Sequence, residues 1–330
     1  MGYALALVAI ALGLRYLGER WWLATVALYL PRIGFGLPLP FITLLVLWKL
    51  PRRWLVTQLF ALGVWLFPLM GLHLGHSRSP SDAATPITIL SFNIGLGGQG
   101  VPAVARVLRA APADIVCLQE TAPHDVPELE AQFSDDYFFH IDGQFFIASR
   151  FRIEEAFVPP PGDSEKSRFV RYRLRTPRGP IHVYSLHATS PQSAFFEFRG
   201  DGLRGELLSG RVFKNDRARS NLEASTAARV AQLRALADDA RKSTLPVLIV
   251  GDTNSPELSE GFARSLGAFR DAYADVGFGL GYSFPWKRVG RFPFMRIDRI
   301  LANERVRFLS VDMPAQRASD HLAIGAVGEL

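Results

Sequence analysis

Hydrophobic and polar positions divide the chain into two parts of different character. Residues 1–75 are almost continuously apolar, with three stretches at about residues 2–18, 33–48 and 54–75. A bilayer core needs about 20 apolar residues in helical conformation. The third stretch meets this length alone, whereas the first two are short or interrupted by Pro and Gly. The pattern predicts an N-terminal membrane anchor of two or three transmembrane helices.

After the anchor, the pattern changes to short β-rich runs that alternate with helical periodicity. Residues 76–86 are polar and rich in Ser and Pro, which indicates a linker. Residues 192–220 have no clear period and are expected to form a long loop near the site. The remaining pattern predicts strands at 87–95, 114–121, 245–254, 296–303 and 321–330, hairpins within 137–150 and 167–189, and helices at 101–113 and 221–243. We therefore expect one α/β domain over residues 87–330.

Charge is distributed unevenly between these two parts. Of the 37 Lys and Arg and the 31 Asp and Glu residues, seven basic and one acidic lie in residues 1–80, so residues 81–330 hold 30 of each. The larger part is formally neutral and lacks the basic excess that drives non-specific binding to DNA. The single cysteine, Cys117, lies in an apolar run and excludes an intrachain disulfide. A buried, unreactive thiol is expected there.

The basic residues of the anchor also predict its orientation. Lys49, Arg52 and Arg53 cluster between the second and third apolar stretches. Cytoplasmic loops retain Lys and Arg, which places this turn inside the cell. Everything after residue 75 is then outside, whether the anchor has two spans or three. The sequence thus predicts a multi-pass protein of the cell (inner) membrane with an extracytoplasmic catalytic domain.

Polar residues capable of chemistry stand at or beside the C-terminal ends of five apolar strands. One such residue alone is usually a turn or a helix cap. Here several have compatible chemistry, and two more precede the last strand. They are Asn93, Glu120, His187, Asp252, Asn254 and Asp298, followed by Asp320 and His321.

The ordered motifs SFNI, LQET, SLHATSP, GDTN, RIDRIL and SDH resemble those of the endonuclease/exonuclease/phosphatase superfamily. The resemblance covers residues 87–330. It implies a four-layer α/β sandwich, in which two facing β-sheets are flanked by helices and a metal-dependent phosphoesterase site lies where the strand ends converge. Thr253 stands where the family usually has an aromatic residue, and should face away from the site.

The expected metal is Mg²⁺, with Mn²⁺ as the alternative, because hard cations prefer carboxylate and carbonyl oxygens. Glu120 is the best candidate ligand, and Asn93 would assist the metal or the phosphate. The resemblance further implies that Asp252 positions or polarises the attacking water and that His187 and Asn254 bind phosphate oxygens. It makes His321 a general base or a phosphate contact, oriented by Asp298 and supported by Asp320.

The membrane anchor is the feature that favours one substrate class over another. A neutral domain held at the outer face of a membrane meets lipid head groups, and residues 194–198 and 277–286 supply aromatic side chains for a lipid-facing rim. The anchor followed by this domain also resembles the teicoplanin-resistance membrane phosphatases, which implies a phospholipid or polyprenyl pyrophosphate substrate. The alternative is a surface-tethered nuclease that cleaves DNA, and a third reading is a degenerate family member that only binds.

Overall fold

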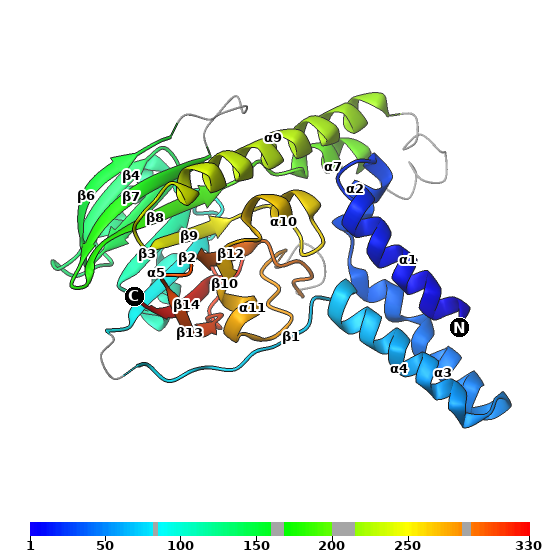
Figure 1. The fold of residues 1–330 in the computed structure, drawn as a ribbon. Helices are drawn as coiled ribbons and strands as arrows, with labels where there is room; N and C mark the ends of the chain where they lie inside the picture. Colours follow the sequence, from blue (N-terminus) through cyan, green and yellow to red (C-terminus); the bar gives the residue numbers. More distant parts are fainter. Residues whose placement is uncertain (82–84, 160–167, 200–214, 286–291) are drawn as a thin grey trace. The chain divides into compact units, whose positions relative to one another are not determined.

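The computed structural model describes residues 1–81, 85–159, 168–199, 215–285 and 292–330 (Figure 1). The chain forms two compact units. The first contains residues 1–73 together with 191–226 and 256–261, and the second contains 74–190, 227–255 and 262–330. The described parts of 191–226 and 256–261 thus pack with the N-terminal helices, whereas the division into an anchor, a linker and a catalytic domain stays a prediction.

The N-terminal part of the first unit is helical. Its α-helices and shorter helices are α1 (Gly2–Leu17), α2 (Trp22–Leu28), η1 (Arg32–Gly36), α3 (Pro38–Lys49), η2 (Arg52–Trp54), α4 (Leu55–Val64) and the π-helical turn η3 (Trp65–Leu69). The segment Arg32–Lys49 is long and apolar enough to cross a membrane, whereas α1 and α2 pass this test only if they are counted together, across a bend of 112°. The expectation that residues 54–75 would suffice alone is not confirmed.

The first unit also includes α7 (Gln192–Arg199) and the first turns of α9 (Asp216–Arg241). The long loop expected over residues 192–220 is wrong for these two segments, and residues 200–214 lie outside the described part. Ala194 and Phe198 of α7 and Ala218 and Leu222 of α9 are buried together. These contacts come from several helices, so no single-helix period revealed them.

The second unit is a sandwich of two six-stranded sheets. One sheet has the order β10-β12-β9-β8-β7-β6 and the other β13-β14-β2-β3-β5-β4. The strands are β1 (His73–Leu74), β2 (Ile87–Asn93), β3 (Ile115–Gln119), β4 (Phe138–Asp142), β5 (Phe145–Ser149), β6 (Arg152–Phe157), β7 (Phe169–Thr176), β8 (Gly179–His187), β9 (Val247–Asp252), β10 (Arg270–Asp271), β11 (Phe278–Gly279), β12 (Asp298–Ala302), β13 (Arg307–Asp312) and β14 (Ile324–Glu329).

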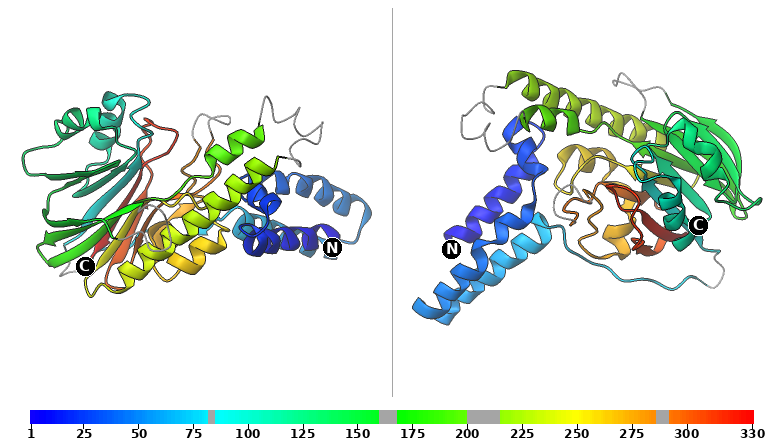
Figure 2. Two further views of the ribbon diagram at one scale, coloured as in Figure 1. Left: turned by 90° about the horizontal axis from the view of Figure 1, so that it is seen from above. Right: turned by 180° about the vertical axis from the view of Figure 1, so that it is seen from behind.

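Helices cover the outer faces of this sandwich, which confirms the expected α/β layers (Figure 2). The remaining helices are α5 (Val101–Ala110), η4 (Pro123–Asp125), α6 (Val126–Glu130), α10 (Glu260–Leu266) and α11 (Ala272–Val276). Val104 and Val107 of α5 pack on β2, β3 and β5. Leu233 and Leu236 of α9 pack on β8 and β9. Because both faces of the central strands are buried, these strands are continuous apolar runs in the sequence.

Side chains between the two sheets become polar toward one edge. Ile89 of β2, Cys117 of β3 and Val183 of β8 belong to the apolar core between the sheets. Further along β2 and β8, on the same face, are Asn93 and His187, because side chains of a strand return to one face every second residue. The core therefore ends in a polar cluster at the edge where these strands end. Cys117 is fully buried, as expected.

Candidate active site

Strand direction explains why the predicted residues meet at one edge. β2 runs parallel to β3, and β8 runs parallel to β9. Asn93, His187 and Asp252 are the last residues of their strands, and Glu120 follows β3. The expectation that Asp298 ends its strand is wrong, since it is the first residue of β12. β12 is antiparallel to β9 and pairs Asp298 with Asp252, so its beginning reaches the same edge.

Asn93 connects the two sheets. Its Nδ2 donates to Glu120 Oε1 at 3.0 Å and to Asp252 Oδ2 at 3.3 Å. Its Oδ1 accepts a hydrogen bond from the Gly95 backbone N–H at 3.0 Å. Glu120 has a positive φ of 55°, which turns it out of the strand direction. Asn93 thus holds two carboxylates with its NH₂ group, while the oxygen expected to assist a metal faces Gly95.

Asp252 and Asn254 form a compact acceptor and donor pair. The Asn254 backbone N–H donates to Asp252 Oδ1 at 2.7 Å, and its Nδ2 lies 3.1 Å from Asp252 Oδ2. Asn254 lies beyond the end of β9 and has a φ of 46°, so a turn and not the strand pleat brings the two together. Thr253 Oγ1 donates to the Ile297 carbonyl oxygen at 2.7 Å, outside this pair.

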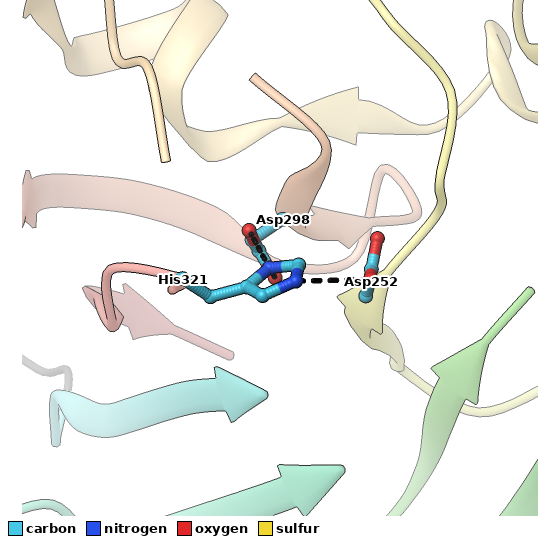
Figure 3. A group of neighbouring side chains, drawn as sticks. All are labelled: Asp252, Asp298 and His321. Atoms are coloured by element: carbon cyan, nitrogen blue, oxygen red, sulfur yellow. Dashed lines mark hydrogen bonds and ion pairs between the residues drawn. The ribbon is translucent and has the colours of Figure 1, made fainter. Parts of the chain in front are cut away.

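Asp298 and His321 form a buried ion pair (Figure 3). His321 Nδ1 lies 2.9 Å from Asp298 Oδ2, and His321 Nε2 lies 3.8 Å from Asp252 Oδ2. Burial lowers the pKa of His321, but the charge and hydrogen bond of Asp298, with contributions from Asp252 and Asp320, outweigh it and raise the pKa to about 10. The imidazole is therefore a cation at neutral pH. Asp320 acts on it through its charge, as a supporting position would.

His187 has the opposite electrostatic environment. Burial, followed by the positive charges of His321 and Arg168, lowers its pKa to about 3. Its Nδ1 lies 2.6 Å from Gln144 Oε1, which fixes the proton on Nδ1. The unprotonated Nε2 then faces Glu120 Oε1 at 3.4 Å and Asp252 Oδ2 at 3.8 Å. Three acceptor atoms thus face one another, with the Asn93 and Asn254 amides as donors to the two carboxylates, and a cation would fit beside them.

The electrostatic environment of Asp252 also favours a cation at this site. Burial, and then repulsion from Asp298, raise the pKa of Asp252 to about 7. Ligand atoms of Asp252, Asp298 and His321 lie within 4.8 Å of one another and could hold a metal ion. Glu120, the ligand expected from the sequence, is not in this group. However, a protonated His321 that already binds Asp298 has no lone pair to offer, so oxygen ligands fit better here.

Three residues of the site were not predicted from the sequence. Gln144, in the turn between β4 and β5, binds His187. The Phe284 ring lies 4.5 Å from the His321 ring, measured between centroids. Arg168 contributes positive charge at His187. Gln144 and Arg168 lie in no recognisable motif, and Phe284 belongs to the stretch 277–286 that was expected at a lipid-facing rim, of which residue 286 lies outside the described part.

Comparisons with known proteins agree with this geometry. The model of the family described as "Endonuclease/Exonuclease/phosphatase family" matches residues 90–321. No curated protein matches the chain.

Solved structures share the fold at low sequence identity. TDP2 from D. rerio, complexed with a single-strand DNA product, is 18% identical, with a TM-score of 0.55 over 74% of this chain and 100% of that one. An endonuclease/exonuclease/phosphatase family protein from Bacteroides thetaiotaomicron is 14% identical, with a TM-score of 0.55 over 75% and 99%. The mannosyl-6-phosphatase Bt3783 from the same organism is 18% identical, with a TM-score of 0.52 over 73% and 98%.

Proposed function

The chain belongs to the endonuclease/exonuclease/phosphatase family, and from this premise we propose that it is a membrane-anchored, Mg²⁺-dependent phosphoesterase that hydrolyses a lipid-linked phosphate. The observation that carries the proposal is the convergence of one cation and several acceptor groups at the edge of the two sheets. The family's hydrolase chemistry needs such a set, because an anionic transition state and an activated water must be stabilised together.

Asp252 is the residue best placed to act as general base. Its pKa of about 7 lies near the working pH, where a base is most effective. The water oxygen forms a bond to phosphorus, Asp252 accepts the proton, and the bond from phosphorus to the leaving oxygen breaks. The Asn254 side chain orients this carboxylate, since its Nδ2 donates to Asp252 Oδ2 at 3.1 Å and to the Ala188 carbonyl oxygen at 2.9 Å.

His321 fits the role of phosphate contact better than that of base. With a pKa of about 10 it is protonated at neutral pH and cannot accept a proton from water. Its Nε2 lies 3.8 Å from Asp252 Oδ2, too far for a hydrogen bond, so this N–H is able to donate to a phosphate oxygen. Asp298 positions the ring from the other nitrogen.

The donor set fits a divalent metal ion. Glu120 would hold it with its carboxylate oxygens, next to Asp252, and Asn93 would orient both carboxylates. When bound, Mg²⁺ withdraws negative charge from the phosphate and lowers the pKa of coordinated water. This arrangement would also satisfy the converging acceptors of Glu120, Asp252 and His187.

The lipid-linked substrate is inferred from the first unit. α3 and α4 expose large apolar side chains on their surfaces, such as Phe41, Leu44 and Trp48 on α3 and Leu59 and Phe60 on α4. Water does not favour such surfaces, whereas lipid does. The turn with Lys49, Arg52 and Arg53 joins these helices and favours the cytoplasmic side. The catalytic unit would then act at the outer face of the membrane.

The test uses the full-length protein in detergent with Mg²⁺. We expect phosphate release from undecaprenyl pyrophosphate, and we expect the His321→Ala variant to lose it by at least about 100-fold, as removal of a transition-state contact does. His124→Ala is the matched control, because His124 is an exposed histidine outside the cluster and should leave the rate unchanged. No release from this lipid or from phosphatidic acid would contradict the lipid assignment.

The same preparation should be tested on supercoiled DNA. TDP2 was crystallised with a DNA product, and its fold is shared here. Nicking that requires Asp252 but occurs without lipid turnover would mean that the anchor only sets the location of a nuclease. Activity toward neither substrate class, with Mg²⁺ or Mn²⁺, would contradict the proposed phosphoesterase.

A further inference from the structure

We propose that α2 and α7 form an interfacial platform, in which α7 lies in the head-group region of the same bilayer that holds the anchor. The inference rests on the proposed membrane anchor and concerns a second lipid contact, made by a segment from the middle of the chain. All residues that carry it belong to the first compact unit.

Charged residues locate the end of α1 at the polar side of the bilayer boundary. Glu19 accepts hydrogen bonds from Ser259 Oγ at 2.8 Å and from the Gly261 backbone N–H at 2.6 Å. Arg20 forms a two-point ion pair with Glu260, at 2.8 and 3.1 Å. Such a network is unfavourable in hydrocarbon. Trp21 and Trp22 follow at once, and tryptophan is enriched at membrane interfaces.

The direction of α2 fits this location. The axis of α2 is bent by 112° from that of α1, so a membrane-crossing α1 would leave α2 nearly along the membrane surface. Trp21 and Leu30, on either side of α2, are about half exposed, at 52% and 51%. Tryptophan at such a boundary is typical of the membrane–water interface.

α7 packs directly on this segment. The Trp22 and Phe198 rings stack with centroids 5.4 Å apart, and the Tyr29 and Phe195 rings lie 5.3 Å apart. Aromatic contacts at these distances are favourable beyond the area that they bury. They hold α7 at the same level as α2 within this unit. Figure 1 shows the two helices side by side, beside the first turns of α9.

One large apolar side chain of α7 is exposed among the residues that the structure describes. Phe196 is 53% exposed, although its neighbours Phe195 and Phe198 pack into the unit. Among the described residues of this unit, Arg217 lies 3.6 Å from Glu197 and Arg219 pairs with Asp216, so these charges are paired. Paired charges beside an apolar side chain do not favour lipid of one net charge over another. The platform is therefore expected to bind through apolar insertion and not through attraction to anionic lipid.

The position of α7 in the chain connects this platform with the site. α7 begins at Gln192, five residues after His187 at the end of β8. An interfacial α7 would thus tether the strand that carries His187 to the bilayer by a short segment. This would favour a substrate whose phosphate stays at the membrane surface.

The experiment labels single introduced cysteines in the full-length protein with an environment-sensitive fluorophore. The native Cys117 should not react, because it is fully buried and burial raises the pKa of its thiol to about 12. Labels are placed by Phe196→Cys in α7, by Phe41→Cys in α3 as the membrane reference, and by Phe157→Cys in β6 as an exposed reference in the second unit. Each protein is reconstituted in phosphatidylcholine nanodiscs with or without lipids that carry a nitroxide quencher.

We expect quenching at position 196 at least half as strong as at position 41, and none at position 157. The same result in nanodiscs with phosphatidylglycerol would support apolar insertion, and quenching only there would contradict it. A label at 196 that behaves like the one at 157 would overturn the platform. If the label at position 41 is also unquenched, the result contradicts both the proposed membrane anchor and the proposed platform. Phosphate release is measured separately on each protein, so loss of activity and loss of membrane contact are distinguished.

Discussion

The ionic states of three buried residues define what the site can do. Asp298 holds His321 protonated, and Gln144 orients an unprotonated His187, while Asp252 has a pKa near neutrality. The site therefore contains an acid, a base and a neutral acceptor within a few ångströms. Environments that separate the pKa values of neighbouring groups in this way are characteristic of acid–base chemistry.

The Asp298→Asn variant tests the cationic state of His321. A folded-state pKa raised to about 10 means that the proton is lost only at alkaline pH. Without the Asp298 charge, burial lowers the pKa to the ordinary value of about 6.5 or below, and the active fraction at pH 8 should fall at least about 30-fold. The measurement is kcat/KM from pH 6 to 10. Asp320→Asn is the control and should shift the alkaline fall of kcat/KM less. If kcat/KM falls at the same alkaline pH in wild type and Asp298→Asn, Asp298 does not hold His321 protonated.

Binding of Mg²⁺ should release a proton from Asp252. Its pKa is raised to about 7, so below pH 7 the ion must displace a proton, and above pH 7 it need not. We expect the apparent affinity to rise up to about tenfold per pH unit from pH 6 and to level off near pH 8. Calorimetry in buffers of different ionisation enthalpy measures both effects. In Asp252→Asn the affinity for Mg²⁺ should be lower, and it should be the same at pH 6 and pH 8. A wild-type affinity that does not change with pH would rule out proton release from Asp252.

Backbone geometry at the strand ends is the main determinant of the site at the scale of elements. Gly251 precedes Asp252 and has a φ of 142°, and a Cβ there would lie 2.0 Å from the Leu186 carbonyl oxygen of β8. The close approach of β8 and β9 at this point is what brings His187 beside Asp252. Only glycine allows it, because both the dihedral angle and the space exclude a side chain.

The Gly251→Ala variant should be strongly destabilised. The strained φ costs about 1–3 kcal/mol, and the contact with backbone adds to this, so we expect the free energy of unfolding to fall by at least about 2 kcal/mol. Gly143→Ala is the matched control. Its φ is also positive, at 56°, but a Cβ would meet nothing within 4 Å, so about 1 kcal/mol is expected. Chemical denaturation of the full-length protein in detergent compares them, and equal losses would contradict the role of the Leu186 contact.

At the scale of the whole molecule, the candidate site and the proposed membrane anchor belong to different compact units. The second unit contains all the predicted site residues, and the first combines the N-terminal helices with residues 191–226 and 256–261. These two insertions leave the catalytic strands just after His187 and just after Asn254. The proposed anchor is thus connected to the site by the chain at two places besides the N-terminal linker.

Reporter fusions test the proposed orientation. A periplasmic alkaline phosphatase reporter joined after residue 330 should be active, and a cytoplasmic fluorescent reporter at the same point should be dark. The reverse is expected for reporters joined after residue 51, in the turn with the basic cluster. Replacing Lys49, Arg52 and Arg53 with Gln should weaken this preference. A dark phosphatase after residue 330 would place the catalytic unit inside the cell and exclude the outer-face substrate.

The sequence by itself determined the family and most strands, and it predicted residues of the candidate site that the fold brings together. The reason is local, since strands buried on both faces are continuous apolar runs and a polar residue at their end is conspicuous. Asn93, Glu120, His187 and Asp252 stand out in this way, and the structure brings them together.

Tertiary structure alone decided the rest, because it depends on contacts between distant segments. Antiparallel pairing placed Asp298 at the beginning of its strand, and a hairpin turn supplied Gln144. Packing joined α7 and the first turns of α9 to the N-terminal helices, where the sequence had indicated a loop. The protonation states of His187, Asp252 and His321 likewise follow from burial and neighbouring charge, which no stretch of sequence contains.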